Sequence, residues 1–276
     1  MSNYETITVE KRGNVAILTI NRPDKLNALN KMVHAEGVAA LDELRRDGEV
    51  RVLVITGAGE KSFIAGADIS EFEGQTPVTQ RDLFHEETFF NSIDAFPKPV
   101  IAMVNGFCLG GGNELALACD RSYQLALPND PAAAPTIEVG ATNFGVYPMV
   151  TGQSRLARRF YNEVPALEAV RVKAGTPLDA DAAFALGLIT SNPDDIDWPD
   201  ETRLAIEERV AMSPDALTGM EANLRFNGEE NMFTRIFGRL TAWQNWIFQR
   251  PNAVGDKGAL KVYGKGERAA FDFNRV

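Results

Sequence analysis

The feature that most constrains the fold of this 276-residue chain is an alternation of short strand-like runs with helical patterns. Residues 52–56 and 100–104 are apolar runs rich in β-branched side chains, which is typical of buried strands. A helical pattern over residues 78–95 lies between them. Another helix precedes the first strand, where apolar residues recur at helical spacing: Met32, Val33, Val38, Leu41 and Leu44. This order predicts an α/β fold.

The two ends of the chain differ from this alternation. Near the start, residues 5–9 and 15–20 are strand-like and are separated by a turn sequence, which predicts a hairpin. The second half is mostly helical, with expected segments at 166–172, 180–186, 201–211 and 228–248. We therefore expect a core that carries the site in residues 1–190 and a helical C-terminal region in 191–276. The tail from Arg250 is expected either to pack on a neighbouring subunit or to be partly disordered.

Composition excludes several classes of function. The formal charge of −10 disfavours a nucleic-acid partner, and no apolar run approaches the ~20 residues of a membrane span. Cys108 and Cys119 lie in apolar segments, so we interpret them as core residues of a cytoplasmic protein that needs no disulfide. The two histidines, His34 and His85, are too few for a metal cluster and are expected on helix surfaces.

A run of three glycines, Gly110 to Gly112, joins an apolar strand to a helix that carries Glu114. The first N–H groups of a helix lack intrahelical acceptors and carry positive dipole character. Glycine also lets a ligand approach the backbone closely. The run therefore predicts an anion site, and the alternative is that these glycines only allow a tight contact between helix and strand.

A second loop has the same character. The strand that ends at Thr56 leads through more glycines to Ala67, and Asp68 and Glu71 follow with the spacing of a capping box. This spacing places Ala67 at the start of another helix. Two backbone amides, one from each loop, could then converge on one oxygen.

Three motifs in this chain resemble the signature regions of the crotonase (enoyl-CoA hydratase/isomerase) superfamily. They are Asn-Arg-Pro at 21–23 with Lys-Leu-Asn-Ala at 25–28, Ala-Gly-Ala-Asp at 65–68, and Asn-Gly at 105–106 with Leu-Gly-Gly-Gly-Asn-Glu-Leu at 109–115. The resemblance covers about residues 7–189. It implies a crotonase-like spiral of ββα units, assembly as a homotrimer or a dimer of trimers, and an acyl-CoA thioester substrate. No cofactor is implied, because coenzyme A is part of the substrate.

The resemblance also assigns roles to individual residues. It makes the amides of Ala67 and Gly111 an oxyanion hole. Each such fixed donor stabilises a developing negative charge in the transition state by ~3 to 4 kcal/mol. Glu114 matches the first of two glutamates that grip water in the family's hydratases. The CoA-binding positions that it implies are Lys25, Leu26, Ala28, Ala65, Gly66, Asp68, Ile69 and Gly110. Lys25 is the candidate for a CoA phosphate, with a solvated surface lysine as the alternative.

The second glutamate of the hydratases has no counterpart at the expected place. Aligning backward from residues 145–148 puts Ala141 there, so the acid is missing. Glu138, three residues upstream, substitutes only if the loop is shifted, and otherwise it is a strand-edge carboxylate. The preceding segment, residues 124–136, is also longer than usual, which predicts an altered pocket wall.

The C-terminal part adds a second resemblance. Residues 121–276 resemble the C-terminal part of benzoyl-CoA-dihydrodiol lyase, a crotonase relative that opens an oxygenated ring with water and releases formate. Three hypotheses follow. The first is an acyl-CoA hydratase or lyase with Glu114 as acid/base, and the second is a ring-opening lyase or hydrolase of an aromatic-derived CoA ester. The third is a CoA-ester-binding protein whose catalysis is impaired at Ala141.

Overall fold

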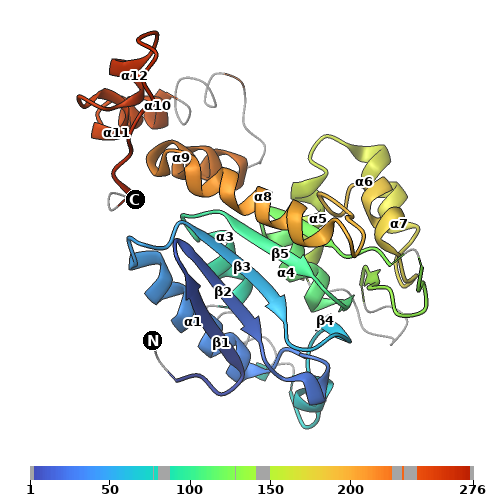
Figure 1. Cartoon of the computed structure of the whole chain (residues 1–276). Coiled ribbons are helices and arrows are strands. Elements are labelled where there is room, and N and C mark those ends of the chain that lie inside the picture. The colour runs from blue at the N-terminus through green and yellow to red at the C-terminus, as the bar shows by residue number, and fades with distance from the viewer. Residues whose placement is uncertain are drawn as a thin grey trace.

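The strand-like runs of the sequence form the centre of a five-stranded sheet (Figure 1). The structure, a computed structural model, describes residues 3–76, 78–79, 88–127, 129–140, 150–225, 232 and 241–273. The sheet has the order β1-β2-β3-β5-β7, with β1 (Ile7–Arg12), β2 (Val15–Ile20), β3 (Val52–Gly57), β5 (Val100–Val104) and β7 (Arg121–Gln124). The predicted hairpin is confirmed, because β1 and β2 pair antiparallel, while the other neighbours pair parallel.

A smaller sheet alternates with the large one along the chain. Its order is β4-β6-β8, with β4 (Ser62–Ile64), β6 (Phe107–Leu109) and β8 (Ile137–Glu138), all parallel. Each of β3, β5 and β7 is thus followed by one strand of the small sheet. Helices α3 (Phe89–Asp94), α4 (Gly111–Ala118) and α5 (Val150–Arg159) come after those second strands. This repeated unit is the expected spiral of ββα turns, and it confirms the predicted fold class.

Helix α1 (Lys31–Arg46) is the helix expected before the first buried strand, and the Asn30 side chain caps it by accepting a hydrogen bond from the amide of Val33. Its buried face is Val33, Gly37, Ala40, Leu41 and Leu44. Met32 was expected in this apolar stripe and is 44 % exposed, because it lies one position off that face. Of the single helix predicted at residues 78–95, residues 78–79 and 88–95 are described. The prediction of one continuous helix is wrong, because Thr88 is extended and its side chain caps a new helix, α3.

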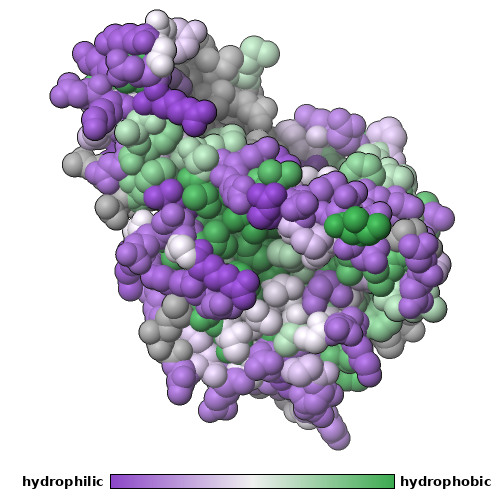
Figure 2. All heavy atoms as spheres, viewed as in Figure 1, coloured by the Kyte–Doolittle hydropathy of each residue, from purple (hydrophilic) through white to green (hydrophobic). Residues whose placement is uncertain are grey.

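The central strands β3 and β5 are buried on both faces, because their side chains alternate between two layers. Leu53 and Ile55 point into the main core beneath α1. Val52 and Ile101 lie on the other face, where they pack against Ala205 of α8 (Trp198–Ala211). Figure 2 shows that hydrophobic side chains still reach the surface beside α8, between the sheet and the helices.

The C-terminal region is helical, as predicted. Besides α8 it contains α9 (Pro214–Arg225), α10 (Thr241–Ile247), α11 (Pro251–Val254) and α12 (Ala259–Val262). Two helices precede this region, α6 (Val164–Arg171) and α7 (Ala180–Ala185), where segments at 166–172 and 180–186 were expected. Most of the helix expected at 228–248 lies outside the described residues. None of the helices in the described ranges has the length and apolar character needed to cross a bilayer.

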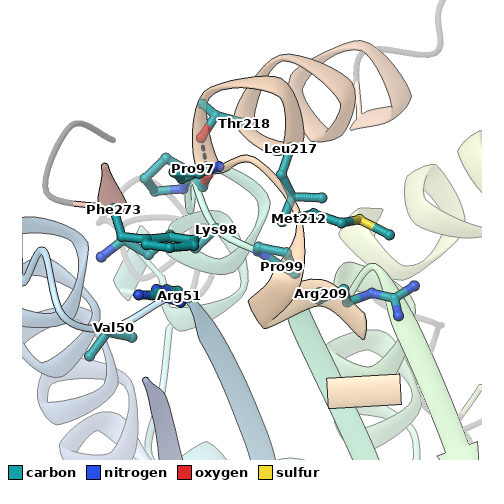
Figure 3. A pocket seen from close by; sticks show the side chains of 11 residues that line it. Val50, Arg51, Pro97, Lys98, Pro99, Arg209, Met212, Leu217, Thr218 and Phe273 are labelled. Carbon is teal, nitrogen blue, oxygen red and sulfur yellow. Dashed lines mark hydrogen bonds between the residues drawn. The ribbon is translucent and has the colours of Figure 1, made fainter. Parts of the chain in front are cut away.

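The tail packs on its own chain rather than extending away from it. Asn252 donates to Asp215 at 2.6 Å and accepts from the amide of Asp272 at 2.6 Å. Phe273 then covers the guanidinium of Arg51, with 3.0 Å from its ring centroid to Cζ. Figure 3 shows these two side chains beside Lys98, in a pocket at the N-terminal ends of β3 and β5. The described part of the tail is therefore held in place by polar groups of α9 and α11, and packing on a neighbouring subunit stays a prediction.

Candidate active site

The loop after β4 presents the amide of Ala67 away from the neighbouring chain segment. The amide of Leu29 donates to the carbonyl of Gly66 at 2.8 Å, and the amide of Asp68 donates to the carbonyl of Leu29 at 2.8 Å. In such a parallel bridge the central residue, Ala67, directs its own N–H to the opposite side. Gly66 has φ 98°, a left-handed conformation that suits glycine.

Gly111 is the first residue of α4 and lies beside that loop. A Cβ built on Gly111 would be 3.7 Å from the nitrogen of Ala67, and one built on Gly66 would be 3.9 Å from the nitrogen of Gly111. The structure thus brings the two predicted oxyanion residues together. Neither amide has a hydrogen-bond acceptor among the residues that the structure describes, so both are available to one oxygen.

The other two glycines of the run have separate structural reasons. Gly110 has φ 45°, which turns the chain from β6 into α4. A Cβ on Gly112 would lie 2.2 Å from the carbonyl oxygen of Ile64, so only glycine allows the helix to approach β4. The alternative interpretation of the run, a tight helix–strand contact, is therefore correct for Gly112.

Glu114 lies in the first turn of α4, and only 3 % of the residue is exposed. Burial raises the pKa of its carboxyl to about 7, opposed by the positive charge of Arg155 and supported by the negative charge of Asp94. Its Oε1 accepts a hydrogen bond from Nη1 of Arg155 at 2.9 Å. A carboxyl with this pKa can accept and release protons near neutral pH.

Arg155, on α5, is a residue of this site that sequence reasoning missed. Its guanidinium also donates to the carboxylate of Asp94 on α3, and its side chain is only 5 % exposed. The sequence signal that could have identified Arg155 is its place on the amphipathic segment of α5, which follows the expected position of the second acid. Its partner could not be read from sequence, because Asp94 and Glu114 lie on two other helices.

Most of the predicted CoA-binding residues lie on two loops that are joined to each other, and the exception, Gly110, directly precedes α4. The amide of Ala65 donates to the carbonyl of Leu26 at 3.1 Å. Arg22 donates to the carbonyl of Ala28 and to the carboxylate of Asp68, the latter at 2.9 Å. Hydrogen bonds from Ser70 and Arg22 lower the pKa of Asp68, so its charge serves to hold the loops. Lys25 and Ile69 are exposed beside this joint.

Two local expectations are wrong. The Asp68–Glu71 spacing does not form a capping box, because the Glu71 carboxylate accepts from the amide of Lys31 at the start of α1. Only Asp68 caps the single 3-10 turn that follows, η2 (Ile69–Phe72). His34 lies only partly at the surface: its ring packs edge-on against Phe90, and burial lowers its pKa to about 4.

The second acid position lies only partly within the described residues. Ala141 and His85 are outside them. Glu138 is at the end of β8, where it is buried and pairs with Leu109 of β6. Its carbonyl oxygen accepts from the amide of Gly110 at 3.3 Å, so its backbone supports the glycine turn.

Comparison with known proteins decides the family. The sequence profile described as enoyl-CoA hydratase/isomerase matches residues 10–248. The chain belongs to the enoyl-CoA hydratase/isomerase family. A crotonyl-CoA hydratase from Syntrophomonas wolfei is 38 % identical over 187 residues, which are 67 % of this family member and 68 % of that enzyme. The crystal structure of an enoyl-CoA hydratase from Bacillus anthracis superposes with a TM-score of 0.81, at 22 % identity, covering 97 % of this chain and 99 % of that one, and shows the shared fold.

The second resemblance is also confirmed. Benzoyl-CoA-dihydrodiol lyase from Aromatoleum evansii is 54 % identical over 187 residues, which are 67 % of this family member. This match is longer than residues 121–276, so the likeness is not confined to the C-terminal part. The chain spans about one third of the length of that lyase, 33 %.

Proposed function

We propose that this enzyme adds water to, or removes it from, an acyl-CoA thioester, with Ala67 and Gly111 as the oxyanion hole and Glu114 as the acid/base. The observation that supports this most directly is the pair of neighbouring amides without described acceptors at the start of the helix that carries Glu114. A thioester oxygen that gains negative charge would lie between two N–H donors and near the positive end of α4.

The proposed hydration needs one carboxyl group. Glu114 accepts a proton from water while the water oxygen bonds to the β-carbon of a 2-enoyl thioester. The π electrons of the double bond then move onto the thioester oxygen, which the two amides stabilise. Glu114 returns a proton to the α-carbon as the enolate collapses, so the product has gained one water. This scheme makes Glu114 sufficient without an acid at Ala141.

The exposed joint between the two N-terminal loops is the proposed CoA site. Ile69 is 76 % exposed and Leu26 is 41 % exposed, which suits contact with an adenine ring. Lys25 lies beside them and is the proposed partner of a CoA phosphate. In a chain of charge −10, such a local positive group is needed to bind an anionic ligand.

The decisive experiment is Glu114→Gln with crotonyl-CoA and a longer 2-enoyl-CoA, following the product by mass spectrometry. We expect wild type to produce a species heavier by one water and the variant to lose about 10²- to 10⁴-fold in kcat, as expected for loss of general acid/base catalysis. An unchanged kcat/KM would remove Glu114 from the mechanism.

A second candidate function is ring opening of an aromatic-derived CoA ester. The observation that supports it is the 54 % identity to the Aromatoleum evansii lyase over 187 residues. Release of formate from a cyclic oxygenated CoA ester, together with no turnover of crotonyl-CoA, would support this candidate. Tight binding of every CoA ester without turnover would instead support the third hypothesis, a binding protein.

We also propose assembly as a homotrimer or dimer of trimers in the cytoplasm. Large apolar side chains on α6, its C-terminal turn and α7 are exposed, namely Val164 at 65 %, Val172 at 77 % and Phe184 at 50 %. Covering such residues stabilises an assembly. Analytical ultracentrifugation tests this, and a monomer at micromolar concentration would contradict it.

A further inference from the structure

Three helices contribute to one cluster of charges beside the candidate site, in which Arg155 and Glu114 are buried and Asp94 and Arg158 are partly buried. Arg155 of α5 donates through Nη1 to Glu114 of α4 at 2.9 Å, and through Nη2 to Asp94 of α3. Arg158, one turn further along α5, donates to the other oxygen of Asp94 at 2.7 Å. Asp94 thus lies between two arginines, and Arg155 lies between two carboxylates.

This arrangement differs from a simple buried ion pair. An arginine paired only with Glu114 would hold that carboxylate in its charged form and make it a weak base. Asp94 shares the positive charge of Arg155, so its own negative charge offsets part of that effect. Glu114 is then fixed in orientation without being locked in one protonation state.

The cluster is also packed against the oxyanion loop. The Cζ of Arg155 lies 5.6 Å from the ring centroid of Phe90. The far end of the same ring, its own Cζ, would be 3.7 Å from a Cβ on Gly111. One aromatic side chain therefore lies beside both the guanidinium and the residue that provides one amide of the proposed oxyanion hole.

We propose that Arg155 is a positioning residue for Glu114, and that Asp94 is the counter-charge that keeps Glu114 able to exchange protons. This inference rests on the proposed function, in which Glu114 moves the protons. Arg155 acts through Glu114 and need not touch the substrate.

The charged neighbours of Glu114 predict in which direction each substitution moves the pKa of its carboxyl. Arg155 lowers its pKa and Asp94 raises it. Arg158 reaches the cluster through Asp94. Among the strands that pack on α4, β4 carries no titratable side chain, and β6 carries only Cys108, whose pKa is raised by burial so that it stays neutral. Arg121 and Tyr123 of β7 are not among the causes of the shift at Glu114.

The test compares Arg155→Gln with Asp94→Asn in the full chain, measuring kcat/KM for a 2-enoyl-CoA from pH 5.5 to 9. Because the basic form of Glu114 is required, the acidic limb reports its pKa in the free enzyme. We expect this limb to move upward in Arg155→Gln and downward in Asp94→Asn, each by about one pH unit, the lower end of the effect of a close charge. Arg155→Lys should retain part of the wild-type rate, and kcat should fall more than KM rises.

Arg171→Gln is the matched control, because Arg171 forms an exposed ion pair with Glu168 on α6. It should leave the profile unchanged. The inference is overturned if the acidic limb of the pH profile does not move in the two variants, or if it moves in the same direction in both. If circular dichroism shows that Arg155→Gln does not fold, the inference is judged from Asp94→Asn alone, by whether its acidic limb moves downward. Full activity in Glu114→Gln would instead refute the proposed function, so the two failures are distinguishable.

Discussion

Replacing Gly111 or Gly112 by alanine separates the chemistry of the glycine run from its packing. A methyl group on Gly111 would meet Leu29 at 3.5 Å and both the Ala67 nitrogen and Phe90 at 3.7 Å, which are ordinary contacts. Gly111→Ala should therefore fold with about wild-type stability. The same methyl group would lie beside the Ala67 amide, where an oxygen needs about 2.7–3.1 Å to its donor.

The magnitudes differ strongly between the two variants. Gly111→Ala should lower kcat by about 10²- to 10³-fold, the effect of losing one oxyanion donor. In Gly112→Ala the methyl group would be 2.2 Å from the carbonyl oxygen of Ile64, so α4 must shift away from β4. Such overpacking costs about 1–3 kcal/mol or more, and the shift also displaces Glu114.

The assay is urea unfolding of both variants together with kcat and KM on the substrate that wild type turns over. Gly111→Ala should lose activity at wild-type stability, and Gly112→Ala should lose both. Wild-type kcat in Gly111→Ala would refute the assignment of the oxyanion hole. Equal destabilisation of the two variants would refute the packing argument.

Two further predictions concern pH. Burial raises the pKa of Glu114 from 4.5 to about 7, so the folded protein keeps a proton that the unfolded chain releases, and wild-type stability falls as pH rises through this window. Between pH 4.5 and pH 8 the free energy of unfolding should fall by up to about 3 kcal/mol more in wild type than in Glu114→Gln. An equal change of this free energy in the two proteins would contradict the prediction. The effect of His34 on stability has the opposite sign. Because its pKa is about 4 in the folded protein against 6.5 in the unfolded chain, stability is lost as pH falls from 6.5 to 4. Thermal unfolding over this pH range should show a smaller loss in His34→Leu. Identical acid sensitivity would show that His34 is accessible to protons in the folded state.

Local patterns in the sequence were sufficient for most of the fold. The strand at Val100–Val104 and the helical spacing of α1 depend on side chains within a few residues, so their signals survive without tertiary information. The motifs around Ala67 and Gly111 likewise identified the family and the two loops that form the candidate site.

Only the tertiary structure decided which distant groups meet. The Glu71 carboxylate accepts from the start of α1 instead of its own turn, and His34 is covered by Phe90. Arg155 joins Glu114 because α3, α4 and α5 pack together, and no local pattern carries that choice of partner. The amides of Ala67 and Gly111 converge for the same reason, since a local sequence can make each loop but only the burial of the whole core sets the distance between them.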